Sequence, residues 1–306
     1  MQWALQAFHR EGVPTVLVPH GYQVVANKPS AVVRAYGTML KLRTRFLCAP
    51  GEMYRRFYAS QGVALERVLV TGAYDWDVGT TNASQRARSL VRCALQPERF
   101  TILYANSASS RGRVRAYAEE THDEMVQSVG DLADAIGGAP DLQLVVRPHP
   151  DMALHELFGD IASRYPNVVV TSQGTFADAL TACDVLVTFC SSAGVQGLAS
   201  DRPVVIYNRR GRMNNYTALL LDREGCGDGF VLAAETPAEL VPSFRRLRDD
   251  TKLRERLAAS RRRVDPLLHR DQRGAAERIA DALLTLARDA RVPCSPPGQP
   301  CGGNFE

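Results

Sequence analysis

The sequence predicts an α/β protein built from two Rossmann-like lobes, of which the first is incomplete. Short apolar runs alternate with segments whose apolar residues repeat at helical spacing, the pattern of parallel strands joined by helices. A polar stretch with little apolar strand content interrupts this alternation at residues 79–99. The chain has 306 residues, which suits two domains of ~150 residues each.

The first lobe is expected over residues 1–78. Its three apolar runs are Val13–Val18, Arg45–Ala49 and Arg67–Thr71, with a helical pattern over Glu52–Gln61. Three strands are few for a doubly wound domain, and the chain begins in mid-pattern with a helix that leads into a strand. We therefore expect the remaining strands of this lobe upstream of Met1. Residues 79–99 are predicted to be a linker or a short connecting helix.

The second lobe is expected over residues 100–270 as a complete doubly wound domain. Six strands are predicted at Thr101–Ala105, Leu142–Arg147, Asn167–Thr171, Asp184–Phe189, Pro203–Asn208 and Gly229–Ala233. Helices are predicted between most of them, at Val114–Ile136, Ala153–Tyr165, Phe176–Cys183 and Ala193–Ser200. Such crossovers between parallel strands are right-handed.

The chain ends with a helix and a tail. Over residues 271–290, the apolar residues Ala275, Ile279, Leu283 and Leu286 repeat at helical spacing. One face of this helix must therefore be buried, and we expect it to pack back on the first lobe. Residues 291–306 are rich in proline and glycine and are predicted to be disordered.

Composition narrows the class of protein. Hydrophobic residues make up 45% and charged residues 23%, as in soluble globular proteins. The net charge of +4 is too small for a nucleic-acid-binding surface, so no nucleic-acid partner is predicted. Seven cysteines without a C-x-x-C pair indicate neither a disulfide framework nor a zinc site, and they fit the cytoplasm. No uncharged stretch is long and apolar enough to span a bilayer.

Two segments of the second lobe follow predicted strands, where ligands of parallel sheets bind. Ser191 and Ser192 stand at the start of a helix, whose free N–H groups and dipole favour an anion, although a serine there is also a common N-cap. Arg147-Pro148-His149-Pro150 holds its backbone extended, since proline restricts itself and the residue before it. His149 can donate to a phosphate oxygen, or it is only a turn histidine. Arg147, in the same segment, is a further candidate for binding the donor.

Two further loops carry candidate residues. Residues 106–113 are small, polar and basic, so Ser107 and Arg111 could help wrap a diphosphate, or the loop is simply solvated. His20 follows the first predicted strand and could be a general base, whereas a turn stabilised by Gly21 is the plainer explanation. Asp75 and Asp77 form a D-x-D pair that no other carboxylate or imidazole cluster completes, so neither a metal nor another cofactor is predicted.

Together these segments resemble the CDP-glycerol glycerophosphotransferases of teichoic-acid synthesis and the related capsule-polysaccharide transferases of the GT-B fold. The resemblance runs from about His20 to Asp289. It is carried by a strand followed by His20-Gly21, and by residues 67–72, 147–150, 183–192 and 201–205.

The resemblance implies roles for particular residues. His149 with Ser191 and Ser192 would hold the donor diphosphate, and His20 would activate the acceptor. Gln196 stands where related transferases often carry a glutamate that binds the ribose hydroxyls. A glutamine accepts a hydrogen bond there less strongly than a carboxylate does.

Three functions remain open. The first is metal-independent transfer of a glycosyl or glycerophosphate group from a CDP-, CMP- or UDP-activated donor in cell-surface polysaccharide or teichoic-acid-like polymer synthesis. The acceptor would be a hydroxyl of a polysaccharide, polyol or lipid-linked molecule, and peripheral contact with the inner membrane face is left open. The second is an epimerase of the non-hydrolysing UDP-N-acetylglucosamine 2-epimerase type, which ranks lower because Asp75 and Asp77 are the only well-placed carboxylates of the first half. The third is a non-catalytic nucleotide-binding fragment or subunit, favoured by the small first lobe and by Gln196.

Overall fold

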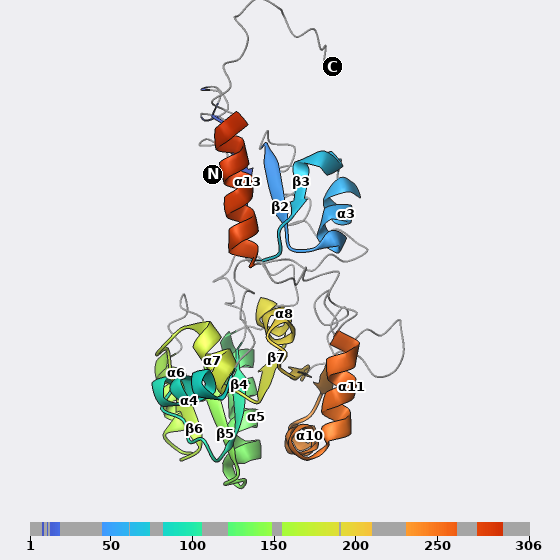
Figure 1. Ribbon diagram of the computed structural model, residues 1–306. Coiled ribbons are helices and arrows are strands. Elements are labelled where there is room, and N and C mark those ends of the chain that lie inside the picture. The colour runs from blue at the N-terminus through green and yellow to red at the C-terminus, as the bar shows by residue number, and fades with distance from the viewer. Residues whose placement is uncertain are drawn as a thin grey trace, which may run out of the picture.

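The computed structural model has an α/β architecture with two parallel sheets, which confirms the fold class (Figure 1). It describes residues 8, 11, 13–18, 45–60, 62–73, 82–105, 122–148, 155–189, 191–209, 231–261 and 274–289. The strands of the first sheet lie in the order β1-β2-β3, and those of the second in the order β6-β5-β4-β7-β8-β9. No helix among these residues is long and apolar enough to cross a bilayer.

The first sheet is small. It contains β1 (Val16–Leu17), β2 (Phe46–Ala49) and β3 (Val68–Val70). β2 pairs in parallel with both neighbours, and helix α3 (Glu52–Ser60) and the 3₁₀ turn η1 (Leu65–Arg67) connect it to β3. Gly62, at φ 85°, supplies the left-handed turn that ends α3.

The second sheet contains six strands, all parallel. They are β4 (Phe100–Tyr104), β5 (Leu142–Val146), β6 (Val168–Val170), β7 (Val185–Thr188), β8 (Val204–Tyr207) and β9 (Leu232–Ala234). When these six strands are numbered 1 to 6 in chain order, their order across the sheet is 3-2-1-4-5-6, as in a doubly wound domain. The strand order reverses between β4 and β7, so the crevice in which such sheets bind ligands belongs at the carboxyl ends of these two strands.

Helices cover both faces of the second sheet. The face that contains Leu103, Val145 and Leu186 is covered by α4 (Ala83–Arg92), α7 (Phe176–Ala182) and α8 (Ser192–Ala199). The other face packs against α5 (His122–Gly137), α6 (His155–Ala162), α10 (Pro237–Asp249) and α11 (Thr251–Arg261). Residues of β2, β3 and α3 belong to the same apolar cluster as residues of α7 and α8, so apolar contacts connect the two units.

Helix α4 occupies much of the stretch expected to be a linker. It begins with a capping box, in which Asn82 and Gln85 each accept a hydrogen bond from the other's backbone N–H. Leu90 is buried, and α4 packs against α7. Residues 83–92 therefore form a packed helix on the second sheet, and the division of the chain into domains stays a prediction.

The C-terminal helix α13 (Ala275–Asp289) lies beside the first sheet (Figure 1). Arg278 Nε donates to the Thr71 carbonyl, just after β3, at 2.6 Å. The buried residues of the helix are Ala275, Ile279, Ala282 and Leu286. The expectation that Leu283 belongs to this face was wrong, because Leu283 is 49% exposed and the buried stripe passes through Ala282 instead.

Candidate functional site

The best candidate site in the described part of the chain is the start of helix α8, next to the point where the strand order reverses. α8 begins at Ser192, four residues after β7 ends, and it packs on β7 and β8. Its first turn therefore lies at the carboxyl edge of the sheet, where doubly wound domains bind their ligands.

Ser191 is the N-cap of α8, as one of the two interpretations of the serine pair requires. Its backbone is extended, at φ −144° and ψ 146°, and its hydroxyl accepts a hydrogen bond from Ala193 N at 3.2 Å. The Ser191 carbonyl accepts from Gly194 N at 3.0 Å. Ser191 thus accepts hydrogen bonds from two backbone N–H groups at the start of α8. Its contact with a donor stays a prediction.

Ser192 is the first residue of α8, and it is partly exposed. Within the described residues its hydroxyl makes no hydrogen bond. Gln196 lies one turn later on the same partly exposed side, whereas Ala193, Gly194, Val195 and Gly197 are buried. Ser192 and Gln196 are therefore the residues of the first two turns that α8 offers to a ligand.

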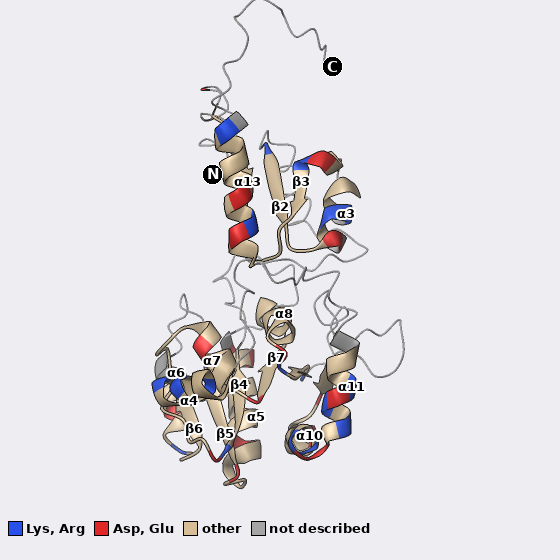
Figure 2. Cartoon of the chain, in the orientation of Figure 1, with Lys and Arg blue, Asp and Glu red and all other residues tan. Residues whose placement is uncertain are grey.

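The first turn of α8 carries no acidic residue. α3, α5, α7, α10 and α13 each carry Asp or Glu in the first turn, whereas α4, α8 and α11 carry none. α8 has no charged residue at all, so it is drawn entirely in tan in Figure 2. A helix N-terminus carries about half a positive charge. Without a carboxylate of its own to offset it, the α8 start favours an incoming anion.

Two polar residues at the ends of β7 and β8 were missed by the sequence analysis. Thr188, the last residue of β7, is 0% exposed, and its Oγ1 has no hydrogen-bond partner among the described residues. Asn208 follows β8 and is also buried; its backbone N–H donates to the Ala234 carbonyl at 2.8 Å. An unsatisfied buried hydroxyl costs roughly 1–3 kcal/mol. In the sequence, both Thr188 and Asn208 are recognisable as polar residues at the end of a mostly apolar strand.

Arg147 follows β5, and its guanidinium is engaged by the protein. Nη1 donates to the Gln173 carbonyl at 2.9 Å, and Nη2 donates to the Gly174 carbonyl at 2.7 Å. Desolvation lowers the pKa of this guanidinium from its ordinary value. The side chain therefore anchors the loop between β6 and α7, whereas α8 starts after β7, about 10 Å away across two strand spacings. A contact between Arg147 and a donor stays a prediction.

The other predicted site residues lie outside the described residues. They are His20, Ser107, Arg111 and His149, and the same holds for Asp75 and Asp77. Their proposed roles consequently rest on the sequence.

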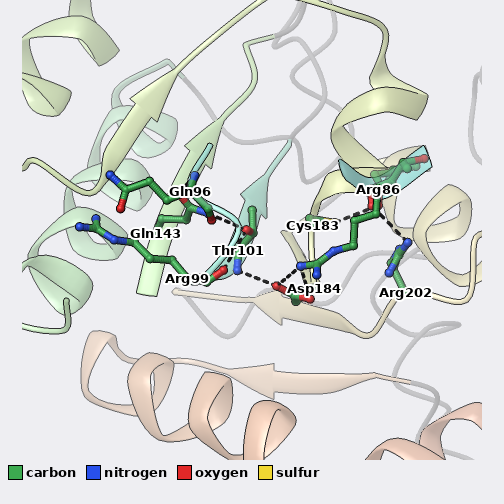
Figure 3. Close-up of polar contacts among 10 residues, drawn as sticks. Arg86, Gln96, Arg99, Thr101, Gln143, Cys183, Asp184 and Arg202 are labelled. Atoms are coloured by element: carbon green, nitrogen blue, oxygen red, sulfur yellow. Dashed lines mark hydrogen bonds and ion pairs between the residues drawn. The ribbon is translucent and has the colours of Figure 1, made fainter. Parts of the chain in front are cut away.

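The opposite edge of the same sheet is closed by an internal polar network (Figure 3). Asp184 accepts from Arg86 Nη2 at 2.7 and 2.8 Å and from Thr101 N at 2.8 Å. Gln143 Nε2 donates to Thr101 Oγ1 at 2.8 Å and to the Gln96 carbonyl at 2.7 Å. These groups hold α4 and the chain that enters β4 against the amino ends of the strands, so their chemistry is structural.

On the other face of the sheet, a charged pair stands beside β8. Tyr207 Oη donates to Asp131 Oδ2 at 2.7 Å, and Arg209 Nε lies 2.8 Å from the same oxygen. Burial, followed by the hydrogen bond to Asp131, raises the pKa of Tyr207. Asp131 therefore offsets the positive charge of Arg209. Among the described groups, the start of α8 is a better anion site than Arg209.

Comparison with known proteins supports the fold. No family model matches the chain, and no curated protein is significantly similar to it. The solved structures do contain similar folds. The wall teichoic acid polymerase TagF has a TM-score of 0.63 at 17% identity, over 92% of this chain and 70% of TagF.

Two further structures resemble the chain to a similar degree. The UDP-GlcNAc 2-epimerase from Neisseria meningitidis bound to UDP-GlcNAc has a TM-score of 0.58 at 14% identity, over 93% of this chain and 73% of its own. A putative UDP-N-acetylglucosamine 2-epimerase from Listeria monocytogenes has a TM-score of 0.61 at 14% identity, over 96% and 72%. At such low identity these likenesses establish the fold, which is the GT-B-like arrangement expected from the sequence.

Proposed function

We propose that this chain is a nucleotide-dependent transferase that moves a glycosyl or glycerophosphate group from a CDP-, CMP- or UDP-activated donor to a hydroxyl acceptor, without a metal cofactor. The observation that carries the proposal is the uncharged, serine-capped start of α8 at the carboxyl edge of a 3-2-1-4-5-6 sheet. In cell-surface polysaccharide or teichoic-acid-like synthesis, the acceptor would be a polysaccharide, polyol or lipid-linked hydroxyl.

The chemistry follows from charge. As the acceptor oxygen bonds to the transferred group, the bond to the nucleotide phosphate breaks and negative charge grows on the leaving phosphate. The N–H groups and dipole at the α8 start, together with the Ser192 hydroxyl, can stabilise that charge without rearrangement. The proposal gives His149, Ser107, Arg111 and Arg147 the task of completing the phosphate site. His20 would accept the proton from the acceptor hydroxyl.

The similar structures support a nucleotide-activated donor. One TagF structure was soaked with CDPG, and the epimerase from Neisseria meningitidis holds UDP-GlcNAc. A third structure with the same fold, Alr3699/HepE of Anabaena, is in complex with UDP and glucose; its TM-score is 0.54 at 15% identity. CDP and UDP are therefore the nucleotides to test first.

The decisive experiment changes the start of α8 without breaking the helix. Proline is tolerated at the first helical position, so Ser192→Pro removes both the N–H and the hydroxyl there. Its extended neighbour Ser191 suits a following proline. Losing charge-assisted contacts worth ~1.5–3 kcal/mol should weaken CDP or UDP binding about tenfold to a hundredfold in calorimetry.

The matched control lies at the other end of the same helix. The Ser200 hydroxyl donates to the Gln196 carbonyl at 2.8 Å, and Ser200→Ala should leave nucleotide affinity unchanged. Wild type that binds neither CDP, UDP nor CMP would overturn the proposal, as would Ser192→Pro that binds them as wild type does.

A second function is favoured by the two 2-epimerase structures with similar folds. The wild-type chain should be incubated with UDP-GlcNAc alone, and separately with CDP-glycerol and a polyol acceptor. Epimerised UDP-sugar in the first reaction would replace the transferase proposal with the epimerase. Nucleotide binding without turnover in either reaction would indicate the non-catalytic subunit.

A further inference from the structure

Thr188 stands out because it is a polar residue in a place built for an aliphatic one. The preceding residues of β7 are Val185, Leu186 and Val187, and all of them are fully buried. Thr188 is fully buried as well, yet its Oγ1 has no hydrogen-bond partner within the described part of the chain. Valine has the same shape and would fill this space without leaving a hydroxyl unsatisfied, so the hydroxyl costs stability.

The register of the sheet explains why the protein offers no partner. Thr188 pairs with Ile206 of β8, and the Ala105 N–H donates to the Val187 carbonyl, which aligns the end of β4 with Thr188. Leu186, two residues earlier, lies on the same face, because side chains alternate along a strand. The neighbours of Thr188 on this face are therefore apolar.

The close approach of α8 to Leu186 indicates that Thr188 lies beneath the first turn of α8. A Cβ added to Gly197 would lie 2.8 Å from Leu186 Cδ2, so the second half of α8 covers Leu186. Because α8 starts at the carboxyl edge, its first turn covers the strand about 6–7 Å further on, which is the position of Thr188. The unsatisfied Thr188 hydroxyl and the start of α8, which favours an anion, are therefore inferred to lie side by side.

We propose that Thr188 is a further donor-binding residue, whose hydroxyl donates a hydrogen bond to a phosphate oxygen of the nucleotide held at the start of α8. This inference rests on the proposed function, since it deepens the same site. Because Thr188 is fully buried, this contact requires a local rearrangement at the end of β7. The hydroxyl then gains the partner that the protein alone does not give it.

The test compares two buried threonines of the same sheet. Thr188→Val should raise or maintain the melting temperature but weaken the binding of CDP, UDP and inorganic pyrophosphate about tenfold or more. Thr188→Ser, which restores a hydroxyl, should recover most of that affinity. Thr101→Val is the matched control at the amino edge, where the hydroxyl accepts from Gln143 and donates to the Arg99 carbonyl. It should lower the melting temperature and leave nucleotide affinity unchanged.

The outcomes separate this inference from the proposed function. If wild type binds nucleotide and Ser192→Pro weakens that binding, but Thr188→Val binds as wild type does, Thr188 is not a donor ligand and the proposed function survives. If the melting temperature of Thr188→Val falls as that of Thr101→Val does, the inference is also overturned. The Thr188 hydroxyl of the wild type would then have a partner inside the protein. Wild type without nucleotide affinity would remove both proposals.

Discussion

At the scale of single residues, the contribution of an ion pair to stability depends on how far its side chains are exposed to water. Arg86 and Arg92 both lie on α4. Arg86 pairs with Asp184, which follows α7, at 2.7 Å, and Arg92 pairs with Asp178, in the first turn of α7, at 2.9 Å. The Arg86 side chain is 32% exposed and belongs to the polar network around Asp184, whereas the Arg92 side chain is 61% exposed. The first pair is therefore harder for water to replace than the second.

Arg86→Ala should lower the free energy of unfolding by about 1.5–3 kcal/mol, because Asp184 would lose a charged hydrogen-bond partner in a partly buried place. Arg92→Ala should cost less than about 1 kcal/mol, as exposed ion pairs do. Urea denaturation of both variants checks the difference. Equal losses would show that the network in Figure 3 adds nothing to an ordinary surface pair.

Packing at the same scale explains why Leu283 was predicted wrongly. Residues 283 and 286 are three positions apart, as helical neighbours should be, but Ala282 also fits the stripe through Ile279 and Leu286. Both alternatives satisfy the periodicity, so spacing alone does not choose between Ala282 and Leu283. In the structure the buried stripe passes through Ala282, and Leu283 is 49% exposed.

At the scale of elements, the helix α8 is positioned by a glycine. Gly197 contacts β7 and β8 so closely that an added Cβ would lie 2.8 Å from Leu186 Cδ2 and 3.0 Å from Val204 Cγ2. Both side chains are fully buried, so neither can move aside freely. The close approach sets the height of α8 above the sheet and with it the place of Ser192 at the carboxyl edge.

Gly197→Ala should therefore destabilise the protein by about 1–3 kcal/mol, since overpacking outweighs the helix propensity that alanine brings. Gly130→Ala in α5 is the control, because nothing lies within 4 Å of its added Cβ, and it should stabilise by roughly 0.5–1 kcal/mol. Thermal unfolding followed by circular dichroism measures both signs. A stabilised Gly197→Ala would mean that α8 does not depend on this contact.

At the scale of the whole molecule, the two units are tied together by apolar contacts and by α13. The apolar cluster that contains Leu47 and Val68 of the first sheet continues into Leu180 and Leu198 of α7 and α8. Arg278 of α13, which follows the second sheet in the chain, bonds to the Thr71 carbonyl of the first unit. Unfolding one unit would expose part of the core of the other, so we expect a single cooperative transition.

The tryptophans allow this expectation to be measured. Both of them, Trp3 and Trp76, belong to the first 78 residues, so their fluorescence reports on the first half, whereas circular dichroism reports on all helices. The two urea transitions should coincide. Leu47→Ala should shift both by the same amount, which corresponds to about 2–5 kcal/mol for a buried leucine. A fluorescence transition that precedes a second phase in circular dichroism would show that the units unfold separately.

The sequence by itself determined the fold class and the positions of most elements. Apolar runs placed all six strands of the second sheet to within a few residues, and helical periodicity placed α7 and α8. These features are predictable because hydrophobic spacing and the turn residues that bound it are local properties of the chain. The serine pair was likewise visible, since helix N-caps have a local signature.

Only the tertiary structure decided which side chains meet. It placed the reversal of strand order between β4 and β7, turned the Arg147 guanidinium toward the Gln173 and Gly174 carbonyls, and left Thr188 without a partner beside α8. None of this can be read from spacing along the chain. Strand neighbours are joined by contacts between residues far apart in sequence, and a polar group finds or lacks its partner only after those neighbours have packed.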